Sequence, residues 1–396
     1  MSGSPTPAWT EPVPGFDDVS DADLRARGNL NWAAAPDGVI PAWVAEMDYA
    51  ASPAVTHVLA ELVRVGRFGY PSHQSVARLR SVTADFVHRH YGWALDPSYV
   101  AGVADVMDGV ALTLESLCAD APVVVPTPAY PPFLEVVPAT RRRIVTLPLD
   151  PDAERATLDL DRIGDALAAG ARTVLLCNPH NPWGRAWTRE ELAGLRDVVL
   201  RHGARVVSDE IHAPLVLPGA EHTPYATLDG TADHVTTLLS ASKAFNLPGL
   251  KCAQIVTGNA ADQRAIAALP LVRNHGLSPL GVEANVAAYT EGDGWLAQVV
   301  THLAGNRELF AEQLTERLPL ARMRRLEATY LAWVDLRAYG VEHPATIAAE
   351  RGQVMVRDGS DFGPGGAGHV RVNVATARDR LVELVRRLGE AFDPAD

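Results

Sequence analysis

The chain has 396 residues, of which 47% are hydrophobic, and its mean hydropathy is close to zero. This length and composition predict a globular protein of roughly two or three domains. The 48 acidic and 35 basic side chains give a formal charge of −13. That balance disfavours nucleic acids and anionic membranes as main partners, because both require clustered positive charge. A small molecule is therefore the expected ligand.

The three cysteines, Cys118, Cys177 and Cys252, are too few and too scattered for a disulfide scaffold or a zinc knuckle. Their odd number fits reduced thiols. The first residues lack the basic and apolar segments of a signal peptide, and no stretch reaches about 18 uninterrupted apolar residues. We therefore expect a cytoplasmic protein without a membrane segment.

Short apolar runs that stop abruptly in polar or proline-rich residues recur along the middle of the chain. They predict buried parallel strands. The four runs lie within residues 121–130, 172–184, 204–212 and 234–243. Between the second and third, Thr188 and Glu191 have the spacing of a capping box and Gly203 supplies a stop, which predicts a helix. A strand, a helix and a strand in this order favour the α/β class.

The C-terminal part has a different pattern. Residues 296–318 predict a long amphipathic helix, and residues 328–336 and 368–375 predict strands. We therefore predict three parts: residues 1–46 as an N-terminal arm and part of a small domain, 47–275 as a large α/β domain, and 276–396 as a smaller α+β domain.

Polar side chains follow the ends of the four predicted strands. They are Tyr130, Asn181, Asp209 with His212, and Ser240 to Lys243. In sheets of this class, ligands bind at the carboxyl ends of the strands. These side chains are therefore expected to share one crevice.

The residue types in this crevice suggest a cofactor. A desolvated lysine beside another cation has a lowered pKa and becomes a nucleophile, and Lys251 is a candidate for the cation that acts on Lys243. Ser240, Ser242 and Lys251 are suitable phosphate partners. Asp209 can pair with a protonated ring nitrogen, and Asn181 can donate to a ring oxygen. Together they describe a site for pyridoxal 5'-phosphate (PLP).

The motifs "NPHNPWG", "SDEIH" and "SASKAFNLPGLK" in this order resemble the fold-type I PLP enzymes of the aminotransferase class I/II superfamily. Within it, "PAWVAEMDYA", "RFGYPS", "PAYPPF", "TYLAWVDLR" and "FGPGGAGHVRVNVA" are similar to the cystathionine β-lyases and related carbon–sulfur lyases. The resemblance covers most of the chain. It implies a large domain with a central, mostly parallel sheet flanked by helices, plus a smaller α+β domain.

The resemblance also implies roles for individual residues. Lys243 would bind the cofactor as a Schiff base and move the Cα proton, with Asp209 at the ring nitrogen, Tyr130 stacked on the ring, and Asn181 and His212 near the phenolic oxygen. The phosphate would be met by Ser240, Ser242, Lys251 and the backbone around Gly109 and Val110 at a helix start. Arg371 would bind the substrate α-carboxylate.

Two further expectations concern the subunit interface and the phosphate loop. Tyr70 would reach a phosphate of the neighbouring subunit, which implies a homodimer with sites at the interface. Asp108 lies where relatives tend to have small or apolar residues, and next to a phosphate it would be repelled unless it turned away to cap the helix.

Other interpretations of these residues are weaker. Asp209 and His212 are also residue types that bind metal ions, but no third ligand follows at a convincing spacing. Residues 363–368 match G-x-G-x-x-G but precede a predicted strand instead of opening a helix, which argues against a dinucleotide site.

Three functions remain open at this point. The first is a PLP-dependent β-lyase that releases a thiol, pyruvate and ammonia from cystathionine or a related S-substituted cysteine. The second is an aminotransferase of the same superfamily, whose turnover would require a keto acid. The third is a regulatory or binding protein that holds the cofactor without turnover.

Overall fold

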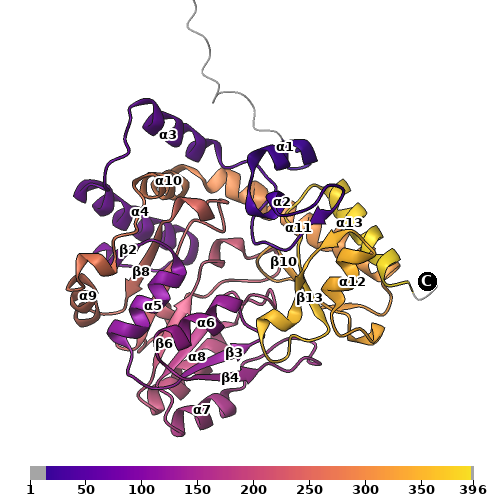
Figure 1. Ribbon diagram of the computed structural model, residues 1–396. Coiled ribbons are helices and arrows are strands. Elements are labelled where there is room, and N and C mark those ends of the chain that lie inside the picture. Colours follow the sequence, from indigo (N-terminus) through magenta and orange to yellow (C-terminus); the bar gives the residue numbers. More distant parts are fainter. Residues whose placement is uncertain (1–14, 394–396) are drawn as a thin grey trace, which may run out of the picture.

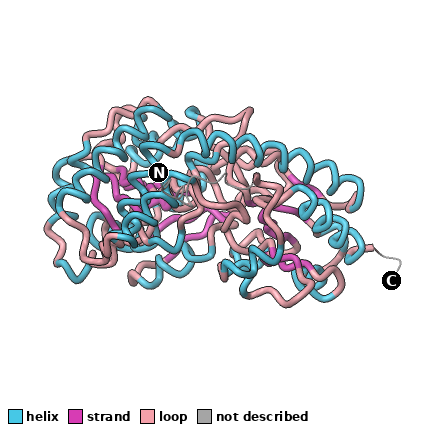
Figure 2. Tube along the Cα trace, turned by 90° about the horizontal axis from the view of Figure 1, so that it is seen from above, coloured by secondary structure: helices cyan, strands magenta, loops and turns pink. Residues whose placement is uncertain are grey.

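The computed structural model describes residues 15–393, which form two lobes of unequal size (Figures 1 and 2). The larger lobe contains a seven-stranded sheet with the order β2-β8-β7-β6-β5-β3-β4. Its strands are β2 (Val100–Val103), β3 (Val123–Thr127), β4 (Ile144–Pro148), β5 (Thr173–Cys177), β6 (Arg205–Asp209), β7 (Val235–Leu239) and β8 (Ala253–Thr257). All neighbours are parallel except β8, which is antiparallel to both β2 and β7. The four predicted parallel strands correspond to β3, β5, β6 and β7, and the predicted α/β class is confirmed.

Helices cover both faces of this sheet because its strands are apolar on both sides. On one face, α7 and α8 share a core with Val124, Val174 and Val206; on the other, α5, α6 and α9 share a core with Val123 and Val207. The bounds are Leu160–Ala168 for α7, Arg189–Arg201 for α8, Val106–Leu117 for α5, Pro131–Ala139 for α6 and Ala260–Ala267 for α9.

The predicted capping box at the start of α8 is present. The Thr188 side chain accepts from the Glu191 backbone N–H, and the Glu191 carboxylate accepts from the Thr188 backbone N–H at 2.7 Å. This exchange satisfies two of the N–H groups that a helix start leaves without partners. It fixes the direction in which the chain leaves the loop after β5, where Asn181 lies.

The smaller lobe is built on a four-stranded sheet with the order β12-β13-β10-β9. The long helix α11 packs against α13, and a two-stranded parallel sheet joins the N-terminal segment to this lobe through β1 and β11. The bounds are β9 (Arg322–Met323), β10 (Leu331–Asp335), β12 (Arg357–Asp358), β13 (His369–Asn373), β1 (Ile40–Pro41), β11 (Val354–Met355), α1 (Asp21–Arg27), α2 (Leu30–Ala33), α11 (Asp293–Arg317), α12 (Pro344–Glu350) and α13 (Arg378–Ala391).

The predicted domain boundary at residue 275 precedes a helix that packs on the large lobe. This helix, α10 (Pro279–Glu291), contacts α3 (Pro53–Arg64) and α4 (His73–Tyr91), which lie beside it in Figure 1. We therefore propose that the large domain extends through α10 and that the small domain begins with α11. The predicted arm, residues 1–46, includes residues 1–14, which lie outside the described part.

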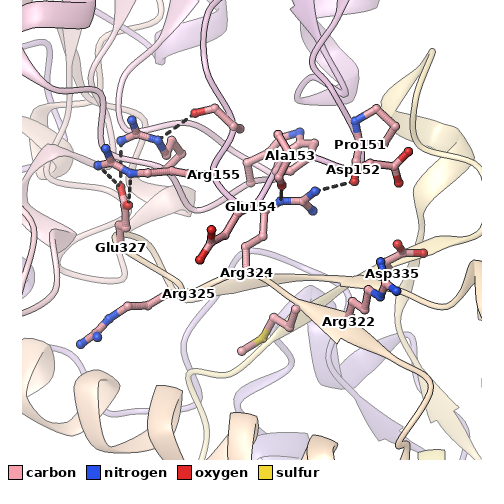
Figure 3. A pocket seen from close by; sticks show the side chains of 14 residues that line it. Pro151, Asp152, Ala153, Glu154, Arg155, Arg322, Arg324, Arg325, Glu327 and Asp335 are labelled. Atoms are coloured by element: carbon pink, nitrogen blue, oxygen red, sulfur yellow. Dashed lines mark hydrogen bonds and ion pairs between the residues drawn. The ribbon is translucent and has the colours of Figure 1, made fainter.

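A cavity of about 610 Å³ lies where the loop after β4 meets the segment after β9 (Figure 3). Its arginines largely join these two parts of the chain. Arg155 and Arg185 both bind Glu327, at 2.8 and 2.9 Å. Arg324 donates to the carbonyls of Pro151 and Ala153. We call Arg155, Arg185, Arg324 and Glu327 the junction clasp.

Within residues 15–393, no helix is both long enough and apolar enough to cross a membrane.

Candidate active site

The carboxyl ends of the parallel strands open on a cavity of about 170 Å³. The predicted site residues at its wall are Tyr130, Asn181, Asp209, His212, Ser240, Ser242, Lys243 and Lys251. The four strand ends therefore bring these side chains together as the sequence predicted. Ala45 also lines the cavity, from the segment that follows β1.

Lys243 projects into this cavity and its Nζ donates to the Ala45 carbonyl at 2.9 Å. Burial, together with the positive charge of Arg371, lowers the pKa of Lys243 to about 8. The sequence predicted that Lys251 is the cation that lowers the pKa of Lys243. Lys251 is instead exposed, and its Nζ binds Asp105 at 2.6 Å. Arg371 takes this place because β13 brings it to the same end of the crevice.

Asp209 is the last residue of β6 and is buried. Burial raises its pKa to about 7, while a hydrogen bond from the Ile211 N–H to Oδ1 at 3.0 Å acts in the opposite direction. A cation placed against this carboxylate would lower its pKa again. The site therefore favours a positively charged ring nitrogen beside Asp209.

Arg371, on β13 of the small lobe, is buried, with 5% of its surface exposed, and it contacts Asn181 at the cavity wall. Its Nη1 donates to Asn181 Oδ1 at 3.2 Å and its Nη2 donates to the Trp43 carbonyl at 2.9 Å. Its Nε has no hydrogen-bond partner among residues 15–393. A buried guanidinium with a free donor is suited to a carboxylate ligand.

His212 and Tyr130 contribute the two rings of the site. Burial lowers the pKa of His212 to about 3, so its imidazole is neutral, and its buried Nδ1 has no partner within the described residues. Tyr130 lies just before α6, and burial raises its pKa. Among residues 15–393, no group of three or more histidine, cysteine, aspartate or glutamate side chains could hold a metal ion.

The region predicted to hold the phosphate begins earlier in the chain than expected. Helix α5 starts at Val106, and the Gly109 N–H already donates to the Asp105 carbonyl within the helix. Gly109 packs against the sheet, where an added Cβ would lie 2.5 Å from Leu238 Cδ1, and Val110 is fully buried. The cavity is lined instead by Asp105, Val106 and Met107. The start of α5, and not Gly109 and Val110, faces the cavity.

The helix cap also differs from the expectation for Asp108. Asp105 is the capping residue: its Oδ1 accepts from the Asp108 N–H at 2.9 Å, and its Oδ2 binds Lys251. The Asp108 side chain is exposed, and its pKa is raised by partial burial and by the charge of Asp105. Lys251 and the N-terminus of α5 thus form an anion-binding position, and the anion bound there in this structure is the Asp105 carboxylate.

The two serines lie on the same side of the cavity. Ser240 Oγ donates to the Cys252 carbonyl at 2.8 Å and accepts from the Ser242 N–H at 3.1 Å. Tyr70, in contrast, does not line the cavity of its own chain. It is 85% exposed, and its ring contacts that of His275 at 5.5 Å.

Sequence reasoning missed Asp105, Trp43 and Tyr330. Tyr330 Oη donates to the Ala45 carbonyl at 2.9 Å, the same carbonyl that accepts from Lys243. These two contacts join residues that are 285 and 198 positions apart in the chain, so no local sequence pattern predicts them. Only the N-cap role of Asp105, three residues before Asp108, had a local signal.

The donor set fits PLP on the structure's own observations. A lysine with a lowered pKa faces a buried aspartate, an orphaned histidine nitrogen lies near them, and a helix start with a lysine offers an anion position. These groups match an aldehyde, a ring nitrogen, a ring oxygen and a phosphate.

Comparison with known proteins decides the family. The model of the aminotransferase class I and II family matches residues 40–388. The chain belongs to this family. Cystathionine β-lyase of Corynebacterium glutamicum is 36% identical to it over 93% of this chain and 98% of that protein. Cystathionine β-lyase PatB of Bacillus subtilis is 33% identical over 89% of this chain and 92% of that protein.

Solved structures of the family agree with the fold. The PLP-bound C–S lyase from Staphylococcus hominis superimposes with a TM-score of 0.89 at 26% identity, covering 96% of this chain and 100% of that one. The predicted family and the fold-type I architecture are confirmed.

Proposed function

We propose that this chain is a PLP-dependent carbon–sulfur β-lyase that releases a thiol, pyruvate and ammonia from cystathionine or a related S-substituted L-cysteine. The observation that carries the proposal is Lys243, which shares the cavity with Asp209 and whose pKa is lowered by burial and by the charge of Arg371. This combination suits proton removal from a bound amino acid. The similarity to two proteins named cystathionine β-lyase, across most of their length, supports this choice of reaction.

PLP, when bound, withdraws electrons from Cα of the attached amino acid. The side chains then supply positioning and proton transfer. Arg371 binds the α-carboxylate through its free Nε–H, and Lys243 Nζ, whose pKa of about 8 leaves part of it unprotonated near neutral pH, takes the Cα proton. The electron pair of the Cα–H bond expels the sulfur from Cβ as a thiolate, which gains a proton. The three-carbon remainder is hydrolysed to pyruvate and ammonia.

The residues that would hold the cofactor are the predicted ones, with Asp209 at the ring nitrogen, Tyr130, Asn181 and His212 around the ring, and Ser240, Ser242 and Lys251 at the phosphate. The start of α5 replaces Gly109 and Val110 as the backbone contact. Because Asp105 binds Lys251, a phosphate would have to share or take over this ammonium group.

We also propose that the protein acts as a homodimer with Tyr70 near the partner's site. Large apolar side chains are exposed in two segments that the Tyr70–His275 contact brings together: Phe68 and Tyr70 in one, Leu271 and Val272 in the other. Their exposed fractions lie between 64% and 85%. Such a surface is typical of an interface.

A cytoplasmic location remains part of the proposal. All three cysteines are buried free thiols. This state is the one that a reducing compartment maintains.

The test uses the full chain loaded with PLP and given L-cystathionine without a keto acid. We expect pyruvate and free thiol to appear in equal amounts. Lys243→Ala should abolish both and also lose the visible absorption band of the bound cofactor.

An aminotransferase would give a different result. If neither product formed while amino acids converted the cofactor to its amine form and a keto acid restored it, the lyase proposal would be wrong. Binding of PLP without any turnover would instead favour a regulatory or binding protein.

A further inference from the structure

A second arginine lies directly beside the proposed carboxylate-binding Arg371. Strands β12 and β13 are antiparallel, and their register pairs Arg357 with Arg371. Residues paired in this way point to the same face of the sheet and lie about 5 Å apart at Cβ. Like charges opposite each other are unfavourable, so each arginine needs an acceptor or an anion to compensate its charge.

The surroundings of Arg357 connect it to Arg371 through Trp43. Its guanidinium lies over the Trp43 ring, 6.0 Å from the ring centre, and Nε binds Asp361 Oδ2 at 2.7 Å. The Trp43 carbonyl in turn accepts from Arg371. Trp43 therefore contacts both arginines, one through its ring and one through its backbone.

The side chains of Trp43, Arg357 and Asp361 include hydrogen-bond donors and an acceptor. Trp43 Nε1 has no partner among residues 15–393, and the side chains of Arg357 and Asp361 keep 35% and 41% of their surface exposed. The group thus combines a guanidinium, an indole N–H and a carboxylate. We call Trp43, Arg357 and Asp361 the outer subsite.

This combination matches the distal end of particular thioethers. Cystathionine and cystine carry a second amino-acid head group beyond the sulfur, with one carboxylate and one ammonium, whereas S-alkylcysteines carry neither. Arg357 and the Trp43 N–H can donate to the carboxylate, and Asp361 can accept from the ammonium. With the near carboxylate on Arg371, the far head group would meet a second set of partners.

We propose that the outer subsite selects substrates whose leaving thiol carries an amino-acid head group. This inference rests on the proposed lyase function and names its substrate class.

The experiment compares kcat/KM for L-cystathionine and S-methyl-L-cysteine, which yield pyruvate by the same elimination. Arg357→Met keeps the aliphatic length and removes the donors. We expect it to lower kcat/KM for cystathionine about 10- to 100-fold, mainly through KM, because a charged hydrogen-bond partner is lost. The value for S-methylcysteine should stay within about threefold, since that substrate never reaches Arg357.

A second variant separates the two charges of the head group. Asp361→Asn should weaken cystathionine but not S-(2-carboxyethyl)-L-cysteine, which has a distal carboxylate and no ammonium, whereas Arg357→Met should weaken both. Arg325→Met, at an arginine with 67% of its side chain exposed, is the matched control and should change neither substrate.

Equal losses for cystathionine and S-methylcysteine in Arg357→Met would show that Arg357 only supports Arg371, and the subsite would be wrong. Should Arg357→Met fail to fold, as judged by the cofactor spectrum, Asp361→Asn decides alone: an unchanged kcat/KM for cystathionine overturns the proposal. A wild-type protein that eliminates from neither substrate contradicts the lyase function itself, which is a distinguishable result.

Discussion

Three buried or partly buried ionisable groups, Asp209, Lys243 and Arg371, lie close to one another at the strand ends. Burial raises the pKa of Asp209 and lowers those of Lys243 and Arg371, so the charged form of each group is less stable than it is in water. A ring cation beside Asp209 and a carboxylate beside Arg371 would relieve this cost. The site is thus poised to bind a cofactor and an amino acid.

The aspartate gives a testable pH dependence. With a pKa of about 7 in the folded chain and about 3.9 when unfolded, Asp209 binds more protons in the native state between these values. Its contribution to the free energy of unfolding therefore falls as the pH rises through this window, and the full cost is reached above pH 7. In cofactor-free protein, we expect Asp209→Asn to raise the free energy of unfolding by about 4 kcal/mol at pH 8 and by about 1–2 kcal/mol at pH 5.

Urea unfolding at the two pH values measures this difference. The same variant should bind PLP more weakly, because an amide lacks the charge that holds a ring nitrogen protonated. An equal gain in stability at both pH values would show that the Asp209 carboxylate keeps an ordinary pKa in the folded chain.

The site residues that follow strand ends could be predicted from the sequence. Each strand is recognisable from its local pattern, and parallel strands all end at the same edge of the sheet. The sequence did not predict that Arg371, instead of Lys251, is the cation near Lys243. That contact depends on how the small lobe approaches the large one. Asp105 was missed for a different reason: Asp108 is also a residue type that caps helices, and the helix begins two residues before it.

The lobes share apolar cores, which include Phe245 with Phe310 and Val174 with Trp333, and charged groups add a second set of contacts at their junction. In the junction clasp, Glu327 binds Arg155 and the buried Arg185, and accepts from the Ala186 N–H at 3.0 Å. Arg185 also binds Glu191, whose carboxylate closes the capping box of α8. One carboxylate thus links the segment after β9 to the loop that carries Asn181.

We expect Glu327→Gln to lower the free energy of unfolding by about 2–4 kcal/mol, because it leaves the buried Arg185 with half of its charge compensation. Chemical denaturation with the cofactor bound measures the change. Glu61→Gln, which breaks the exposed pair with Arg64, is the control and should leave the unfolding midpoint unchanged. A Glu327→Gln variant as stable as the wild type would mean that the clasp contributes no net stability.

For the elements, apolar runs and capping residues were sufficient to predict β3, β5, β6, β7 and α8. The assignment of α10 to a lobe was not predictable from such patterns, since α10 is buried over most of its length and its sequence does not say which partners cover it. Packing against α3 and α4 places it with the large lobe.

The whole molecule presents an exposed apolar surface on the large lobe, around Tyr70 and Leu271, on which the proposed dimer depends. Because Tyr70 does not line its own cavity, the proposal requires each site to combine Lys243 of one subunit with Tyr70 of the other.

Mixed dimers test this arrangement. Tyr70→Ala and Lys243→Ala should each lose activity, since one removes the phosphate contact and the other the reactive amine. When the two variants are unfolded and refolded together, half of the dimers are hybrids, and each hybrid has one site in which both residues are wild type. We expect recovery of about a quarter of the wild-type activity. If Tyr70 served its own subunit, the mixture would stay as inactive as its components.

The segment from Trp43 to Asp48 is synthesised early, yet its partners are among the last residues to be made. Asn373 Nδ2 donates to the carbonyls of Val44 and Glu46, more than 300 residues away along the chain, and the Asp48 N–H donates to the Ala375 carbonyl. During translation this segment therefore cannot form these hydrogen bonds until β13 has left the ribosome. A message cut short before Asn373 would yield a chain that contains Lys243 but lacks the strand that holds Ala45 against it.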